Sequence, residues 1–179
     1  LVFTAVLGIG YMLLITAIGQ VALPFQANGS LVRSADGTVV GSTLIGQSFQ
    51  DADGQALPQY FQSRPSAATY DGAASTGSNL GPENPDLIAS IQQGRSNFRD
   101  LNGAGSVPAD AVTASGPGLD PEISVANAER QVARVAEARG IPSSEVEALV
   151  AQHTLPRDLG YLGDPRVNVF ELNRALDAR

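Results

Sequence analysis

The stretch LVFTAVLGIGYMLLITAIGQVAL, residues 1–23, decides how the chain is organised. Gln20 is its one strongly polar residue, and the first charged residue of the sequence, Arg33, lies beyond it. A helix of this length is about 34 Å long, which covers a hydrocarbon core of about 30 Å. Because backbone amides find no water inside lipid, such a segment is stable there as a helix. The pattern predicts one transmembrane helix over residues 1–23.

Two other interpretations of this stretch stay open. A buried helix of a soluble protein is usually shorter and amphipathic. A cleaved signal peptide is the stronger rival, since Ala17-Ile18-Gly19 is a small-x-small triplet, although the apolar run exceeds the usual core of about 7–15 residues. Cleavage would give a secreted protein, for instance a hydrolase, with a mature N-terminus near Gln20.

The flank that follows the apolar run predicts the side of the membrane on which the remaining chain lies. Residues 24–50 contain a single basic residue, Arg33, whereas cytoplasmic flanks are enriched in Lys and Arg. We therefore expect residues 24–179 to form an extracytoplasmic soluble domain.

The charged and reactive residues exclude several function classes. The 179 residues carry a formal net charge of −7 and no cysteine, and every basic residue is Arg. Without Lys or Cys the chain has no Schiff-base lysine, thiol nucleophile or thiolate metal site. The acidic balance argues against a nucleic-acid partner, because binding phosphates requires a basic face.

GAASTGSN, residues 72–79, begins as a phosphate-binding loop does, with a glycine, four residues and a second glycine. In such a loop the next residues are Lys and Ser or Thr, which contact the phosphates and Mg²⁺; here they are Ser78 and Asn79. The stretch is more typical of turns that lead into a helix. Its backbone amides could still hold an anion, so a nucleotide-binding regulatory subunit with its own ATP site is the alternative hypothesis.

The remaining patterns predict one small α+β domain. β-Branched runs around Asp36-Gly37 indicate a hairpin, residues 50–85 indicate long ordered loops, and residues 109–115 indicate a short strand. Capping residues predict four helix starts. These are Asn84 before Pro85, Ser124 for a helix to Arg139, Ser144 with Glu147, and Asn168 with Glu171.

Two polar residues are candidates for function by themselves. His153 is the only histidine, and since a zinc site needs several ligands and no Gly-x-Ser-x-Gly elbow occurs, we interpret it as a structural residue at a helix end. Arg64 precedes Pro65, which favours an extended backbone. It either binds an anion or a partner carboxylate, or forms an internal salt bridge, which is the commoner role.

Five strings, in order along the chain, resemble the C subunit of the bacterial Kdp high-affinity potassium-transporting ATPase. They are YFQSRPSAA, GSNLGPENP, VPADAVTASGPGLDP, QVARVAEARG and HTLPRDLGYLGDPRVNVFELNRALD. The resemblance implies an accessory, non-catalytic subunit with one N-terminal span in the bacterial inner membrane. Its implied partners are a potassium-translocating subunit, a P-type ATPase subunit and a small single-span subunit.

The resemblance also implies a catalytic chaperone that raises the affinity of the ATPase subunit for ATP. That role places the domain in the cytoplasm, whereas the charge pattern places it outside. We expect the chain to have no cofactor or metal of its own. ATP is at most shared with the ATPase subunit.

Three residues depart from the pattern of that family: Thr76 replaces a frequent Gly, Glu83 a hydroxyl residue, and Glu122 a common His. Glu83 disfavours an anion beside it through like charge. We expect the loops at residues 60–85 and 107–121 to contact a partner. The candidate contact residues are Arg64, Ser78, Asn79 and Asp120, and no catalytic residue is expected.

Overall fold

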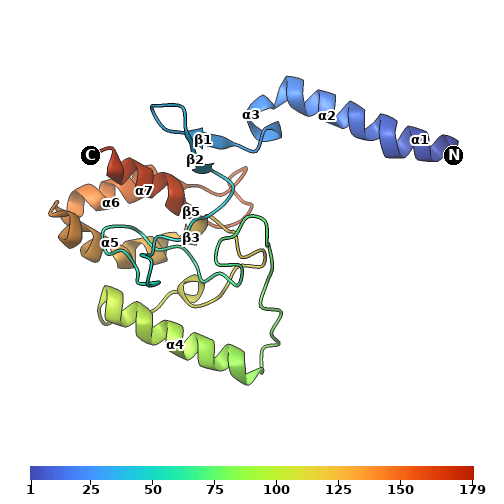
Figure 1. Cartoon of the computed structure of the whole chain (residues 1–179). Helices are drawn as coiled ribbons and strands as arrows, with labels where there is room; N and C mark the ends of the chain where they lie inside the picture. Colours follow the sequence, from blue (N-terminus) through green and yellow to red (C-terminus); the bar gives the residue numbers. More distant parts are fainter. The chain divides into compact units, whose positions relative to one another are not determined.

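The computed structural model describes all 179 residues, and the chain divides into two compact units, Leu1–Leu44 and Ile45–Arg179. The first unit starts with a continuous helical segment, Val2–Ala22, which spans 21 residues with a mean hydropathy of 2.1 (blue in Figure 1). No other helix is long and apolar enough to cross a membrane. The segment comprises α1 (Val2–Ala5), a π-helical stretch (Val6–Gly10) and α2 (Tyr11–Ala22), and the short α3 (Pro24–Ala27) follows.

The hairpin predicted around Asp36-Gly37 is present in the first unit. Strands β1 (Leu31–Arg33) and β2 (Val39–Ser42) pair antiparallel. The Asp36 carboxylate accepts hydrogen bonds from Ser34 Oγ and Thr38 N, and these bonds lower the pKa of Asp36. An aspartate that bonds its own turn in this way is a common device of tight hairpins.

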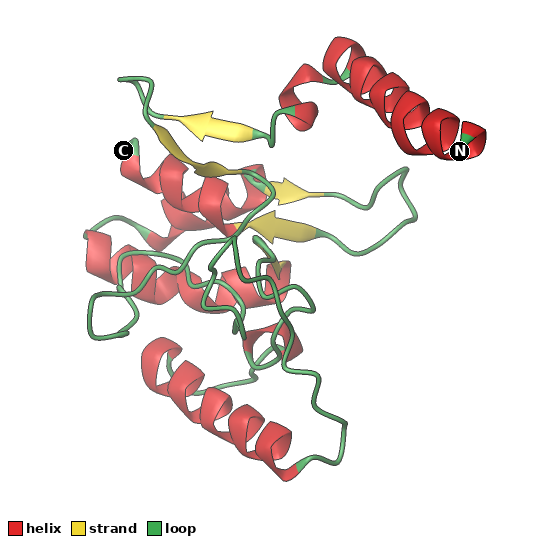
Figure 2. Cartoon of the chain, turned by 45° about the vertical axis from the view of Figure 1, so that its right-hand side comes forward, coloured by secondary structure: helices red, strands yellow, loops and turns green.

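Three short strands form the sheet of the second unit, in the order β3-β5-β4 with both pairings antiparallel (yellow in Figure 2). They are β3 (Glu122–Ser124), β4 (Thr154–Leu155) and β5 (Arg166–Asn168). Ile123 lies opposite Val167, and both are buried. The strands are short because β3 and β5 each run directly into a helix.

Three helices pack around the core of the second unit: α5 (Val125–Arg139), α6 (Ser143–Gln152) and α7 (Val169–Asp177). They bury the apolar faces that the sequence predicts, because residues three and four apart share one side of a helix. The core includes Phe61, Ile123, Ala128, Val132, Val135, Val146, Leu149, Val167, Leu172 and Leu176. The predicted fold class, a small α+β domain after one N-terminal apolar helix, is confirmed.

Side-chain caps begin three helices where the sequence predicts them. The cap oxygens of Asn84, Ser124 and Asn168 accept hydrogen bonds from the backbone N–H groups of Asp86, Asn127 and Glu171. Such bonds satisfy backbone donors that have no partner inside the helix. The expected end of α5 is also confirmed, since Gly140 follows it in the left-handed conformation with φ 65°.

The helix α4 (Pro85–Asn102) is long, yet none of its residues is buried. Two arginines of α5 hold its C-terminal end: Arg130 donates to the carbonyls of Asn102 and Gly103, and Arg134 donates to Asn102 Oδ1. Guanidinium groups suit this end of a helix, because its free carbonyls carry partial negative charge. The helix lies at the edge of the domain opposite α7 (Figure 1).

Two local predictions are wrong. Residues 109–115 do not form a strand; a 3₁₀ turn, Ala109–Ala111, occupies their start. This turn allows the Asp110 carboxylate to accept hydrogen bonds from Ser124 N, Ser124 Oγ and Asn127 Nδ2 at the start of α5. The capping box at Ser144 is also absent, since α6 begins at Ser143 after Pro142 without a side-chain cap.

Candidate functional site

Arg64 and Asp120, two of the four predicted contact residues, form an ion pair with each other. Arg64 Nη1 lies 3.1 Å from Asp120 Oδ2, and the side chains are 24% and 27% exposed. Arg64 Nη2 also donates to Thr113 O at 3.4 Å, and Asp120 Oδ1 accepts a bond from Glu122 N at 2.9 Å. The internal salt bridge expected as the commoner role of Arg64 is therefore formed. It ties the segment around residue 64 to the segment that enters β3.

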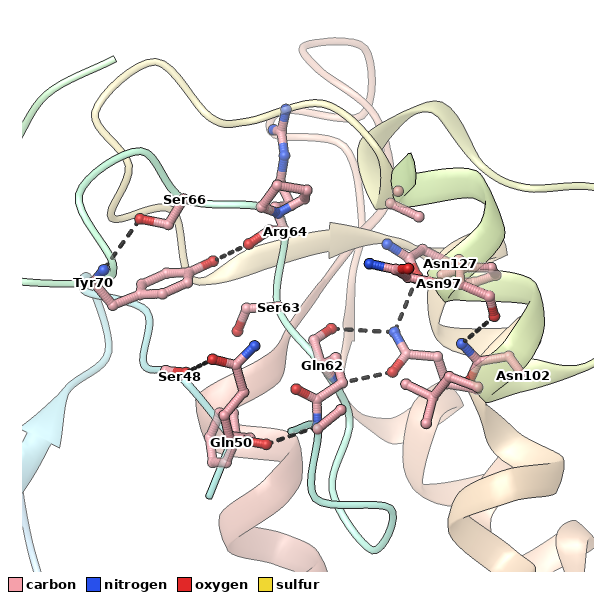
Figure 3. A pocket seen from close by; sticks show the side chains of 18 of the residues that line it. Ser48, Gln50, Gln62, Ser63, Arg64, Ser66, Tyr70, Asn97, Asn102 and Asn127 are labelled. Atoms are coloured by element: carbon pink, nitrogen blue, oxygen red, sulfur yellow. Dashed lines mark hydrogen bonds between the residues drawn. The ribbon is translucent and has the colours of Figure 1, made fainter. Parts of the chain in front are cut away.

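Tyr70 reinforces this junction from inside the first loop. Its hydroxyl donates to Arg64 O at 2.7 Å (Figure 3). Burial, together with the nearby Asp120 carboxylate, raises the pKa of Tyr70 to about 12. Thr69 and Tyr70 both adopt positive φ, 48° and 60°. Non-glycine residues are rarely held there unless the surrounding structure imposes it.

The glycine loop 72–79 packs against residues 116–118. A Cβ atom at Gly77 would lie 2.7 Å from Gly116 O, so only glycine allows this approach. Thr76 N donates to Pro117 O at 3.1 Å, and Ser75 Oγ donates to the same carbonyl at 3.1 Å. In the structure, this glycine makes room for a neighbouring backbone segment.

Ser78 and Asn79, the other two predicted contact residues, lie at the exposed end of that loop. Asn79 has a positive φ of 52° and donates from Nδ2 to Gly77 O. Neither residue bonds to Arg64 or Asp120. The four predicted residues thus fall into one ion pair and one exposed loop end, both within the loops 60–85 and 107–121. We call these two loops the two-loop surface.

A cleft of about 440 Å³ adjoins the two-loop surface. Figure 3 shows Asn97, Asn102 and Asn127 on one side of it, with Ser48 and Gln50 on the other. The lining contains no carboxylate, and Arg64 supplies its only formal charge. Its carboxamide side chains are Gln47, Gln50, Gln62, Asn97, Asn102, Asn127 and Gln131. We call it the amide-lined cleft.

The sequence did not reveal the amide-lined cleft, because its residues come from loops between residues 47 and 70, from α4, from the turn at Ala111 and from α5. The one local signal is the pair Asn127 and Gln131, which are one helical turn apart. Both are buried, with an exposed fraction of 1%. Gln131 Nε2 donates to Asn127 Oδ1 at 3.0 Å, and Asn127 Nδ2 donates to Asp110 at 3.0 Å. These two side chains line the cleft, and their amide groups are hydrogen-bonded to each other and to Asp110.

No group of three His, Cys, Asp or Glu side chains is placed to hold a metal ion. His153 follows the last residue of α6, where its N–H donates to Leu149 O. Glu122, one of the three departures, forms an ion pair with Arg166 at 2.9 Å across β3 and β5. Each of these groups has a place in the fold of the domain.

Comparison with known proteins gives a family over the whole chain. The family model described as the K⁺-transporting ATPase, c chain, matches residues 1–178. A potassium-transporting ATPase KdpC subunit of Sorangium cellulosum is 56% identical over 182 residues, which cover 99% of this chain and 92% of that protein. The protein of that name from Caulobacter vibrioides strain NA1000 is 54% identical over 179 residues, covering 99% of this chain and 88% of that protein.

A KdpC subunit of Methylococcus capsulatus is 50% identical over 183 residues, with 99% of this chain and 93% of that protein covered. These matches extend from the apolar helix to α7 and confirm the resemblance found in the sequence. The chain belongs to the KdpC family, the C subunits of the potassium-transporting ATPase.

Proposed function

We propose that the chain is an accessory, non-catalytic subunit that is anchored by Val2–Ala22 and supports assembly of the potassium-transporting complex. In this proposal the unit Ile45–Arg179 lies on the extracytoplasmic side of the bacterial inner membrane. It meets the potassium-translocating subunit, and the ATPase subunit and a small single-span subunit complete the assembly. The two-loop surface is the part that contacts the partner.

The observation that carries this proposal is that the two loops of the two-loop surface are bonded to each other and closely packed. Its loops lack regular structure over most of their length, yet they are joined by the Arg64–Asp120 pair, by the bond from Ser66 Oγ to Gly118 O at 2.6 Å, and by the packing of Gly77. Loops held in one shape by a scaffold are the usual carriers of binding function. A preordered surface also loses little conformational entropy when a partner binds.

The charge distribution after the helix supports the extracytoplasmic location. Residues 24–50 contain one basic residue, Arg33, and a cytoplasmic flank normally carries several. The net charge of −7 also suits a domain near a cation entrance, where it would raise the local K⁺ concentration. Screening limits that effect to about 8 Å at physiological salt.

The chain raises the affinity of the ATPase subunit for ATP indirectly in this arrangement, through its contacts with the partner subunits. The alternative is a direct ATP site in the glycine loop, in which case the domain lies in the cytoplasm. Two observations weigh against it: the loop has no lysine, and the Arg64 guanidinium is paired with Asp120. Titration of the full chain with an ATP analogue distinguishes the two, because a direct site predicts saturable binding below millimolar concentration.

The absence of cysteine makes a clean test of sidedness possible. Gln152→Cys introduces a single thiol at an exposed position of α6, outside the two-loop surface, and a membrane-impermeant maleimide is added to intact spheroplasts or to inverted vesicles. The proposal predicts labelling in spheroplasts and protection in inverted vesicles. Labelling in inverted vesicles alone would place the domain in the cytoplasm and contradict the proposed location.

The assembly role is tested by a chain that keeps Leu1–Leu44 and lacks Ile45–Arg179. We expect the other subunits to co-purify poorly or the complex to lose affinity for K⁺. The matched control is the full chain with Gln152→Cys, at an exposed position outside the two-loop surface. If the complex that contains the shortened chain keeps its subunits and its affinity for K⁺, the accessory role of the domain is contradicted.

A further inference from the structure

The amide-lined cleft contains carboxamides that the protein already uses and carboxamides that have a free end. Asn127 and Gln131 belong to the first kind, since they bond to each other and to Asp110. Asn102 does as well, because its Oδ1 accepts a bond from Arg134 and its Nδ2 donates to a carbonyl within α4. Bonds of this kind fix the walls of the cleft and leave these groups little to offer a ligand.

Three polar atoms of the lining have no partner in the protein: Gln50 Nε2, Asn97 Nδ2 and Gln62 Oε1. The other end of each side chain is held. Gln50 Oε1 accepts from Ser48 Oγ at 3.1 Å, and Asn97 Oδ1 accepts from Gln93 Nε2 at 2.7 Å. Gln62 Nε2 donates to three backbone carbonyls. Gln50 and Asn97 lie on opposite sides of the cleft (Figure 3), so both of its walls carry a free donor.

Aromatic side chains lie beside these polar groups. Gly94, Phe98 and Leu101 line the cleft from α4 and share one side of that helix, because they are three or four residues apart. Phe98 is half-buried and no residue of α4 is fully buried, so its ring is not enclosed by the core. Phe49 and Tyr70 line the cleft from the loops. The face of an aromatic ring carries partial negative charge, and C–H groups of a ligand pack well on it.

The charges of the cleft argue against a charged ligand. No carboxylate lines it, whereas Ca²⁺ and Mg²⁺ are bound mainly by carboxylate oxygens. Its one formal charge, Arg64, is paired with Asp120 at 3.1 Å. Ligands that carry phosphates, nucleotides among them, are bound by basic side chains that are free to pair with them. The cleft therefore favours a neutral ligand that both donates and accepts hydrogen bonds.

We propose that the amide-lined cleft binds a neutral sugar. Sugar hydroxyls both donate and accept hydrogen bonds, which suits the free donors of Gln50 and Asn97 and the free acceptor Gln62 Oε1. The C–H face of the ring then packs on Phe98. The volume of about 440 Å³ lies within the usual range of small-molecule sites. This site goes beyond the proposed function, since it lies within one chain and requires no other subunit.

A peptide is the other neutral ligand that is rich in donors and acceptors. An extended peptide is commonly bound by adding it as a strand to a free sheet edge. No residue of the strands β1 to β5 lines the cleft, so the cleft offers no such edge. Its free groups are side-chain amides that stand apart on two walls, and this arrangement favours a compact ring over an extended chain.

The first test is isothermal titration calorimetry of the full chain in lipid nanodiscs, because detergents with a sugar headgroup would compete for the cleft. The probes are glucose, N-acetylglucosamine, maltose and diacetylchitobiose, with an ATP analogue and a blocked trialanine peptide for comparison. We expect at least one sugar to bind saturably with a Kd of about 1 mM or lower, and neither comparison ligand to do so. If no sugar saturates, or if the nucleotide or the peptide binds instead, the proposal is overturned.

The second test places the sugar in the cleft. Asn97→Leu removes a free donor, and Phe98→Leu removes the ring, so each should raise the Kd of the tightest-binding sugar about fivefold. Gln92→Leu is the matched control, since Gln92 is an exposed carboxamide of α4 that does not line the cleft, and it should keep the wild-type Kd. A Kd that neither Asn97→Leu nor Phe98→Leu changes would place the sugar elsewhere and contradict the proposal.

Discussion

Asn173 Oδ1 accepts a hydrogen bond from Phe61 N at 2.9 Å, and Asn173 Nδ2 donates to Phe61 O at 2.9 Å. On the next residue, Gln131 pairs in the same way with Gln62 N and Gln62 O, at 2.7 and 3.1 Å. Two carboxamides, one from α7 and one from α5, thus replace the neighbouring strands that this segment lacks. Because a buried backbone amide must find a partner, these pairs are what allow residues 61–62 to cross the core.

Replacement of Asn173 with Leu tests this relationship. The two residues are fully buried, with exposed fractions of 1% for Asn173 and 0% for Phe61. Asn173→Leu keeps a similar volume and leaves two buried backbone groups of Phe61 unpaired, at about 1–3 kcal/mol each. We expect the free energy of unfolding of the full chain in detergent to fall by about 2–4 kcal/mol.

Asn97→Leu is the matched control for that measurement, since Asn97 is an exposed carboxamide of α4. It should change the free energy of unfolding by no more than about 0.5 kcal/mol. Equal effects of the two substitutions in urea denaturation would show that the bonds between Asn173 and Phe61 do not hold the segment in place.

Gly118 offers a test of the close packing inside the two-loop surface. It has a positive φ of 68°, and a Cβ atom there would lie 2.8 Å from both Ala68 Cβ and Thr76 O. Gly118→Ala should therefore cost about 1 kcal/mol for the backbone conformation and about 1–3 kcal/mol more for the overlap.

Gly160→Ala separates these two contributions. Gly160 also has a positive φ, 83°, but a Cβ atom there would meet open space. In thermal unfolding of the full chain we expect Gly160→Ala to lower the midpoint clearly less than Gly118→Ala. If both lower it equally, the loops separate enough to admit a methyl group, and the two-loop surface is less rigid than proposed.

The features that the sequence predicted correctly are local in their physics. Asn84, Ser124 and Asn168 cap helices within three residues of themselves, so their types and spacings contain the whole interaction. The apolar run 1–23 is likewise a matter of length and composition. The strand predicted over 109–115 failed because Asp110 bonds to Ser124 and Asn127, a contact with a distant segment that outweighs local β preference.

Only part of the candidate site could be predicted from the sequence, because its contacts join residues that are far apart in the chain. Arg64 and Asp120 could each be named from their loops, but the ion pair joins positions that are 56 residues apart. The role of Gly77 depends on Gly116 O, and the amide-lined cleft depends on several segments that are far apart in the sequence. Proximity of this kind is set by the packing of α5, α6 and α7, which no single motif encodes.

The raised pKa of Tyr70 predicts a loss of stability at high pH. Burial favours the neutral phenol, so its pKa in the folded chain, about 12, exceeds the ordinary value of 10.0. The resulting stabilisation is complete below pH 10 and is lost as the pH rises towards 12, because the unfolded chain then releases a proton that the folded chain retains. Tyr70→Phe, which cannot ionise, should lack this component.

The measurement is the difference in unfolding free energy between the parent chain and Tyr70→Phe at several pH values. Below pH 10 the parent chain should be more stable by a constant amount, since its hydroxyl bonds to Arg64 O. The advantage should shrink between pH 10 and 12. A difference that stays constant over this range would show that Tyr70 ionises alike in the folded and unfolded chain.

Substitutions in the Arg64–Asp120 pair can distinguish a structural role of the pair from a role in binding a partner. In a double-mutant cycle with Arg64→Met and Asp120→Asn, we expect a coupling energy of about 0.5–1.5 kcal/mol, because the pair is largely but not fully buried. Asn at position 120 can still accept the bond from Glu122 N, so Asp120→Asn should be the milder of the two single changes.

The same variants, assembled with the other subunits, are then compared for their apparent affinity for K⁺. If the pair acts only by holding the two-loop surface in shape, affinity should follow stability, and the double variant should resemble Arg64→Met alone. If instead Arg64 reaches a carboxylate of the partner, Asp120→Asn should free its guanidinium and preserve or improve affinity while stability falls. The pairing at 3.1 Å favours the first outcome; an affinity that rises as stability falls would refute it.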